Sequence, residues 1–331
     1  MPSWAQALLR VSRNKWVQAA FGIVASGSLA YLAAHNIVWK EVADAFIAFP
    51  PELALLALVP LAAAIALRAS RWHVLLHRDG VSFLQVLLTQ NTGLGFNNLS
   101  PVRMVSEPVQ LAMINRRYGV PFPRAFATLV GENVLDIFTT ALMMALGVLL
   151  SPGVRATNAN IQLIGAFIMF VVSALILTAV VRGAVPWQDR FAFLQRIVEG
   201  FRNLKDEPAR LWLSLGANIA HWLLLGVAGW LLALGLDMDV HPVTMATILV
   251  AATFFTSAVP SVPSGAGTYH FAVVTMLTES GADAAAALNF ALMMHLLIVL
   301  PPTAIALFMT GRMSLGTLRN PGGAPERVSD A

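Results

Sequence analysis

The chain has 331 residues, of which 57% are hydrophobic and only 11% are charged, whereas about a quarter of the residues in soluble domains carry a charge. This composition excludes an ordinary soluble protein and predicts an all-α polytopic membrane protein. The net charge of +4 indicates topology rather than nucleic-acid binding, because the basic residues cluster in loops that we assign to one membrane face. Cysteine is absent, which excludes disulfides and cysteine-ligated metals.

Six apolar segments are long enough for a helix to cross a hydrocarbon core about 30 Å thick. The first segment is too long for the core of a signal peptide, so we interpret it as a retained span. In chain order the predicted full transmembrane helices are 16–38, 53–69, 125–150, 161–181, 211–236 and 284–310.

Two further apolar segments, 81–115 and 243–280, are interrupted near their middles by helix-breaking residues. The first contains GLGFNNLSP at 93–101, and the second contains PSVPSGAG at 260–267. Glycine and proline in such runs break helices, and the freed backbone groups are tolerated at membrane depth only beside protein or a watery cavity. We therefore predict two re-entrant broken helix pairs.

The distribution of basic residues predicts the topology. With both broken segments returning to the face they came from, most of the 21 Lys and Arg residues fall on the cytoplasmic side, and both termini are cytoplasmic. The two halves then form an inverted repeat. The first half is 12–150 and contains the re-entrant pair 81–115, and the second half is 158–312 and contains the re-entrant pair 243–280. Residues 182–210 are expected to form a cytoplasmic amphipathic connector, and 313–331 a flexible cytoplasmic tail.

The two interruptions predict where a substrate binds. In secondary transporters, matched interrupted segments of two inverted halves meet near the midplane and form the site. The alternative is that both breaks are packing kinks in an inert bundle. The candidate binding residues at the breaks are Asn97, Ser100 and Pro101 in the first half and Pro263, Ser264, Gly265, Gly267 and His270 in the second.

Four ionisable residues are predicted at membrane depth, where they are costly enough to be functional candidates. They are Arg103, Glu107, Glu132 and Asp136. The acids Glu132 and Asp136 are four residues apart and share a helix face. We expect Arg103 to link Glu107 to Glu132 or Asp136. This network either contacts a headgroup or coupling proton, or is a staple that locks the broken helix to the span at 125–150.

The histidines give a weaker signal. His73 and His77 are four residues apart but lack the Glu of a zinc-protease helix, so interfacial anchoring is favoured over metal binding. His221 and His295 are read as hydrogen-bonded interior residues. We find no nucleophilic triad, phosphate-binding glycine loop or metal cluster, and predict no enzyme activity and no cofactor.

Several motifs are similar to those of the lysylphosphatidylglycerol synthase transmembrane-domain family, which is described as flippase-like. They are RASRW at 68–72, SPVRMVSEP at 100–108, VGENVLD at 130–136 and PSVPSGAG at 260–267. The resemblance covers nearly the whole chain and implies a membrane domain that handles lipids. The chain departs from the family pattern at Ser106, Gln110 and His270, where members carry Gly, Arg and an acid. After Arg312 only a short polar stretch follows, so we do not expect lysyl transfer.

The predicted function is the binding or translocation of a phospholipid or other polar lipid through a midplane cavity between the two broken segments. Arg103 is expected to meet a phosphate, and the acids to meet an amino group. A small-solute or proton-coupled transporter is the alternative, followed by a non-transporting scaffold subunit of a membrane complex. The expected partners are membrane lipids and not nucleic acid. The sequence leaves open whether the chain forms a homo-oligomer or binds a partner in a membrane complex. The expected location is the cytoplasmic (inner) membrane.

Overall fold

A computed structural model describes residues 15–35, 37–100, 105–150, 208–259 and 261–319, together with residues 167, 168, 171, 175 and 178. Every regular element in this part of the chain is helical. Most of the predicted crossing at 161–181 and most of the connector at 182–210 lie outside the described residues. An all-helical membrane fold is confirmed for the part that the structure describes.

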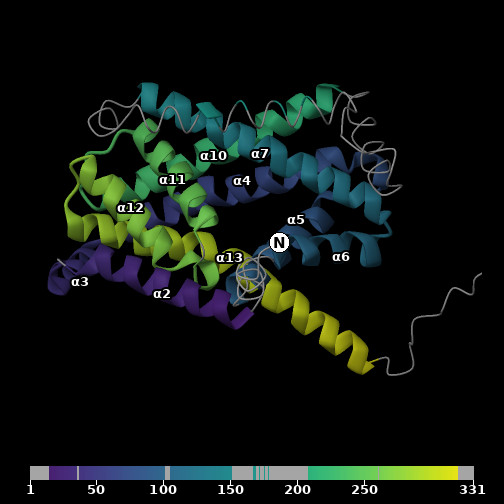
Figure 1. Cartoon of the computed structure of the whole chain (residues 1–331), viewed down its shortest axis with the longest axis horizontal. Helices are drawn as coiled ribbons and strands as arrows, with labels where there is room; N and C mark the ends of the chain where they lie inside the picture. The colour runs from purple at the N-terminus through teal and green to yellow at the C-terminus, as the bar shows by residue number, and fades with distance from the viewer. Residues whose placement is uncertain are drawn as a thin grey trace, which may run out of the picture.

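The helices follow one another with short breaks (Figure 1). In chain order they are α2 (Lys15–Ala34), α3 (Trp39–Ala48), α4 (Pro51–Leu75), η1 (His77–Asp79), α5 (Phe83–Leu99), α6 (Ser106–Tyr118), α7 (Phe122–Leu150), α10 (Pro208–Gly235), α11 (Pro242–Ala258), η4 (Pro263–Gly265), α12 (Thr268–Glu279) and α13 (Ala284–Arg319).

Four of the predicted crossings coincide with helices that are long and apolar enough to span a membrane. They are α4, α7, α10 and α13. The first predicted crossing is different, because α2 turns by 80° into α3, and the two together make at most one bent span. We did not predict α3, since Lys40, Glu41 and Asp44 made that stretch read as a loop. Helix α13 also continues to Arg319, beyond the predicted start of the tail, and 320–331 lie outside the described residues.

The first interruption lies later in the chain than predicted. Helix α5 runs through Gly93 and Gly95 to Leu99, and the next helix begins at Ser106. The prediction that Gly93–Leu99 breaks the helix was therefore wrong. The glycines serve packing instead, because a Cβ atom on Gly95 would lie 2.2 Å from the carbonyl oxygen of Pro302 in α13. Small residues of this kind let membrane helices approach closely.

The second interruption separates α11 from α12, as predicted. Ser264, Gly265 and Gly267 have φ angles of 60°, 77° and 84°, a region that favours glycine. Gly267 is required for a second reason, since a Cβ atom there would lie 2.2 Å from the carbonyl oxygen of Ser26 in α2. The Ser26 hydroxyl also accepts a hydrogen bond from the Val262 N–H at 2.9 Å. The break is thus fixed against α2.

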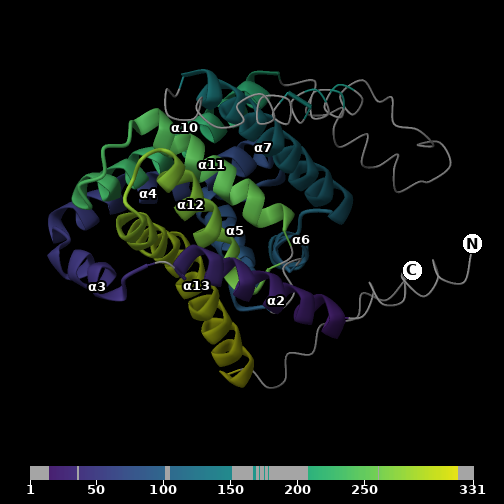
Figure 2. The same ribbon diagram turned by 60° about the vertical axis from the view of Figure 1, so that its left-hand side comes forward.

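The packing between helices has a paired pattern (Figures 1 and 2). Helices α4 and α10 lie along each other. The contacts among α4, α5, α6 and α7 recur among α10, α11, α12 and α13. The matched contacts are α4–α5 with α10–α11, α5–α6 with α11–α12, α6–α7 with α12–α13, α4–α7 with α10–α13, and α5–α13 with α11–α7. Helix α5 also contacts η4, so elements of the two interrupted segments touch.

Large apolar side chains remain exposed on the outer faces of the helices. Examples are Phe21 in α2, Val59 in α4, Leu223 in α10 and Phe308 in α13. Such surfaces would be costly in water, and they are what helices facing lipid present. The distribution agrees with the multi-pass membrane protein predicted from composition.

The close approach of α5 and α13 gives a stability prediction. Replacing Gly95 by Ala should lower the free energy of unfolding by about 1–3 kcal/mol, the range for overpacking a tight interface. Thermal unfolding of the purified protein in detergent measures the effect. The control is Gly216→Ala in α10, because a Cβ atom there has no neighbour within 4 Å. Equal stability of the two variants would contradict the packing role of Gly95.

Candidate functional site

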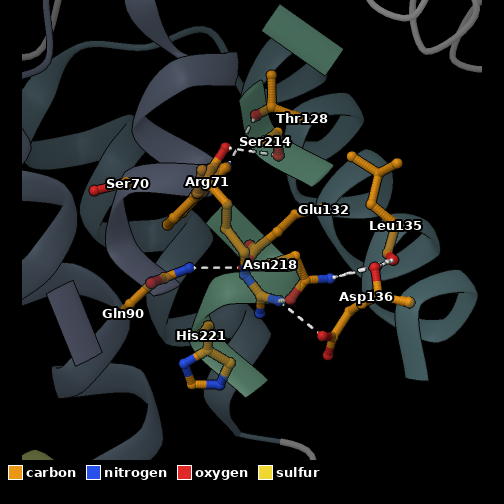
Figure 3. Close-up of polar contacts among 12 residues, drawn as sticks. Ser70, Arg71, Gln90, Thr128, Glu132, Leu135, Asp136, Ser214, Asn218 and His221 are labelled. Atoms are coloured by element: carbon orange, nitrogen blue, oxygen red, sulfur yellow. Dashed lines mark hydrogen bonds and ion pairs between the residues drawn. The ribbon is translucent and has the colours of Figure 1, made fainter. Parts of the chain in front are cut away.

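A buried ion network connects α4 to α7 and α10 (Figure 3). The Arg71 guanidinium in α4 donates from Nε to Glu132 Oε1 at 2.8 Å and from Nη1 to Asp136 Oδ1 at 2.7 Å. The same Nη1 donates to Asn218 Oδ1 in α10. We call Arg71, Glu132, Asp136 and Asn218 the central network. One arginine thus satisfies two acids of the neighbouring helix.

Two side chains that are not part of the central network donate hydrogen bonds to its carboxylates. Gln90 in α5 donates from Nε2 to Glu132 Oε1 at 2.9 Å, and Trp222 in α10 donates from Nε1 to Asp136 Oδ1 at 3.2 Å. Each carboxylate therefore accepts one charged and one neutral hydrogen bond. This pairing makes buried charge tolerable, because an ion pair in a low-dielectric interior needs additional hydrogen bonds to offset its desolvation.

Helix α10 is held to the network by its own polar residues. The Asn218 amide donates to Thr139 Oγ1 at 3.0 Å and to the Leu135 carbonyl at 3.2 Å in α7, and the Ser214 hydroxyl donates to the Arg71 carbonyl at 3.1 Å in α4. The donor and acceptor ends of Asn218 thus fix two helices at once. Polar side chains commonly join membrane helices in this way.

The members of the network differ in exposure. The side chains of Arg71 and Glu132 are each only 4% exposed, whereas the side chain of Asp136 is 31% exposed. Asp136 is therefore the acid of the network that a ligand can reach.

The structure gives these acids a cation that we did not predict. Glu132 and Asp136 both pair with Arg71, so Arg103 is not the sole cation at membrane depth. Arg103 lies outside the described residues, and its contact with the acids stays a prediction. Arg71 was missed because we ended the second crossing at residue 69, which placed Arg71 in a loop. Helix α4 instead runs to Leu75. The uninterrupted helical pattern through Trp72 was the available signal. The prediction that Glu132 and Asp136 share a helix face is confirmed.

Arg68 is a second arginine on α4, one turn before Arg71. Its Nε is buried and has no hydrogen-bond partner among the residues that the structure describes. Both acids of the central network, and also Glu107, lie within electrostatic range of it. The formal charges of the two arginines and of the acids Glu132 and Asp136 cancel. Arg68 therefore balances the network without donating this hydrogen bond to it.

A second polar cluster lies at the break between α11 and α12. The Tyr269 and His295 rings stack with centroids 5.1 Å apart, and the His270 ring packs edge-on to His295 at 4.8 Å. His295 Nε2 lies 3.0 Å from the Ser264 carbonyl oxygen, and the Gly267 N–H lies 3.2 Å from His270 Nδ1. The break thus brings together three polar rings from α12 and α13.

The predicted binding residues fall into three groups. Pro263, Ser264, Gly265, Gly267 and His270 lie together at the second break. Asn97 and Ser100 lie at the end of α5, where Asn97 Oδ1 is buried without a partner among the described residues. Glu107 is exposed at the start of α6, and Pro101 lies outside the described residues, as Arg103 does. Within the part of the chain that the structure describes, no three His, Cys, Asp or Glu residues are arranged to hold a metal.

The comparison with protein families identifies a match that covers most of the chain. The family model described as the lysylphosphatidylglycerol synthase TM region matches residues 19–306, which include every helix named in the central network. A search of curated proteins finds no significant match.

The central network predicts a large stability loss when its cation is removed. Arg71→Ala leaves the buried carboxylate of Glu132 and the partly exposed carboxylate of Asp136 without their shared partner, which should cost about 3–5 kcal/mol of unfolding free energy. Chemical unfolding in detergent measures the effect, with the exposed Arg312→Ala as the matched control. Because the missing charge is the cause, the double variant Arg71→Ala/Glu132→Gln should lose less than the sum of the two single losses. Strict additivity would contradict the pairing.

Proposed function

Because this chain belongs to the lysylphosphatidylglycerol synthase TM region family, we propose that it binds or translocates a polar phospholipid at membrane depth. The single observation that carries the proposal is the central network, a set of paired charges buried between apolar helices beside two interrupted ones. Ionisable groups in such positions are expensive and mark substrate paths. Lipid headgroups are the charged molecules that a membrane supplies at this location.

The paired helix contacts support an inverted repeat. Each contact among α4, α5, α6 and α7 has a counterpart among α10, α11, α12 and α13, and α5 packs on α13 as α11 packs on α7. A two-fold relation between halves produces such reciprocal contacts. In this arrangement α5 with α6 and α11 with α12 are the two re-entrant pairs, and six further segments cross the inner membrane with both termini in the cytoplasm.

The charges suit a headgroup that carries both a phosphate and an amine. Arg68 offers a buried Nε–H that is not used by the described residues, and arginine matches phosphate geometry. Asp136 offers a partly exposed carboxylate to an amino group. Because the two arginines and the two acids already cancel, a headgroup with no net charge leaves the site neutral. The acyl chains would remain in the hydrocarbon beside the apolar helix faces.

The proposal assigns different roles to the two arginines of α4. Arg71 holds the helices together, whereas Arg68 meets the substrate. Substitution of Arg68 therefore separates transport from folding in a way that substitution of Arg71 does not.

The test is lipid movement in reconstituted vesicles. Arg68→Gln should slow the movement of a fluorescent phospholipid about tenfold or more, because it removes a hydrogen bond from a charged donor. Dithionite quenching of the outer-leaflet fluorophore measures the rate. Arg68→Lys should keep part of it, since the charge remains without the planar guanidinium.

The matched control is Arg312→Gln, because Arg312 is exposed at the end of α13 and should not affect the rate. All variants are compared at equal reconstitution and with thermal unfolding checked. A folded Arg68→Gln variant that moves lipid at the wild-type rate would reject the assignment.

A further inference from the structure

The hydrogen bonds of the second polar cluster fix which ring nitrogens carry protons. His270 Nδ1 accepts from the Gly267 N–H, so in a neutral ring the proton lies on Nε2. His295 Nε2 points at the Ser264 carbonyl oxygen, which only accepts, so this nitrogen is also a donor. The ring nitrogen of His270 that Gly267 does not contact therefore carries the proton and is a donor.

Two donors of this cluster are buried without a partner. His270 Nε2 and Tyr269 Oη form no hydrogen bond to any residue that the structure describes. Tyr269 is only 4% exposed, and its ring lies in contact with His295 and 6.0 Å from His270 between centroids. A buried donor without an acceptor costs about 1–3 kcal/mol. Two such donors within one cluster form a place where an acceptor other than the described residues can bind.

The position of the donors indicates the charge of that acceptor. Tyr269 and His270 belong to the first turn of α12, which begins at Thr268. The first N–H groups of a helix have no acceptor within the helix, and the helix dipole favours an anion there. The tight turn with Gly265 and Gly267 in the left-handed region places this first turn directly after the break.

We propose that Tyr269 Oη–H and His270 Nε2–H form a second binding station for the phosphate of a phospholipid headgroup, separate from Arg68. The proposal rests on the lipid-binding function above. It adds that the second half holds the phosphate by neutral donors at the start of α12, whereas the first half holds it by a charged guanidinium.

The substitutions can be made nearly isosteric. Tyr269→Phe removes only the hydroxyl. His270→Asn keeps an oxygen near the position of Nδ1, which can still accept from the Gly267 N–H, and removes the distal donor. His270→Gln places an amide N–H near the position of Nε2 and restores that donor. Tyr31→Phe is the matched control, because Tyr31 is 67% exposed on α2.

The experiment uses the full chain carrying Arg68→Gln, so that the first station is already removed. Binding of a short-chain phosphatidylethanolamine, and of the matching diacylglycerol without phosphate, is measured by native mass spectrometry in detergent. The phospholipid should bind and the diacylglycerol should not. Tyr269→Phe and His270→Asn should each weaken phospholipid binding about tenfold, while His270→Gln and Tyr31→Phe should leave it within about twofold.

The outcomes separate this station from the proposed function. Equal binding of diacylglycerol, or unchanged binding in folded Tyr269→Phe and His270→Asn variants, overturns the station and leaves the Arg68 transport test untouched. No phospholipid binding to the Arg68→Gln protein also overturns it. Competition by inorganic phosphate at millimolar concentration shows that the station takes free phosphate as well, whereas the absence of competition assigns it to the lipid headgroup.

Discussion

The pairing of Arg71 with Glu132 and Asp136 is the constraint on which the arrangement of the other helices depends. In a hydrocarbon environment an isolated charge is so costly that its partners must be supplied by the protein. Here one guanidinium meets two carboxylates of α7 and the Asn218 amide of α10. Three helices therefore have only one relative register in which all four groups are satisfied, and Gln90 adds α5 to the same register.

This constraint separates structural groups from groups that remain available. Hydrogen bonds to Arg71 and Gln90 satisfy Glu132, which is buried, whereas Asp136 keeps part of its surface exposed. Arg68 balances the charge, but its Nε–H has no partner among the described residues. In the proposed function, the paired groups Arg71 and Glu132 hold the helices in place, while Arg68 and Asp136 remain available to a headgroup that enters and leaves. A fully satisfied network would act only as a staple.

Sequence reasoning found the helices and the acids better than it found their partner. The length of the apolar segments identified four spans, because a helix must be about 20 residues long to cross a bilayer. The spacing of Glu132 and Asp136 placed both acids on one helix face. The family was also recognised from motifs and is confirmed. Arg71 was missed because arginine near a span end is normally read as interfacial, and only packing shows that α4 continues with Arg71 buried. Gly93 and Gly95 were misread for the same reason, since a glycine in a tight helix crossing and one in a break look alike in sequence.

The two halves use the same helix plan with different chemistry. The first interrupted segment lies beside charged groups, while the second lies beside Tyr269, His270 and His295. A path that binds a phosphate must hold it well enough to admit it and weakly enough to release it. In the proposed function Arg68 and the two neutral donors of α12 would meet both needs, because the guanidinium would compensate the desolvation of the phosphate and the neutral donors would not trap it.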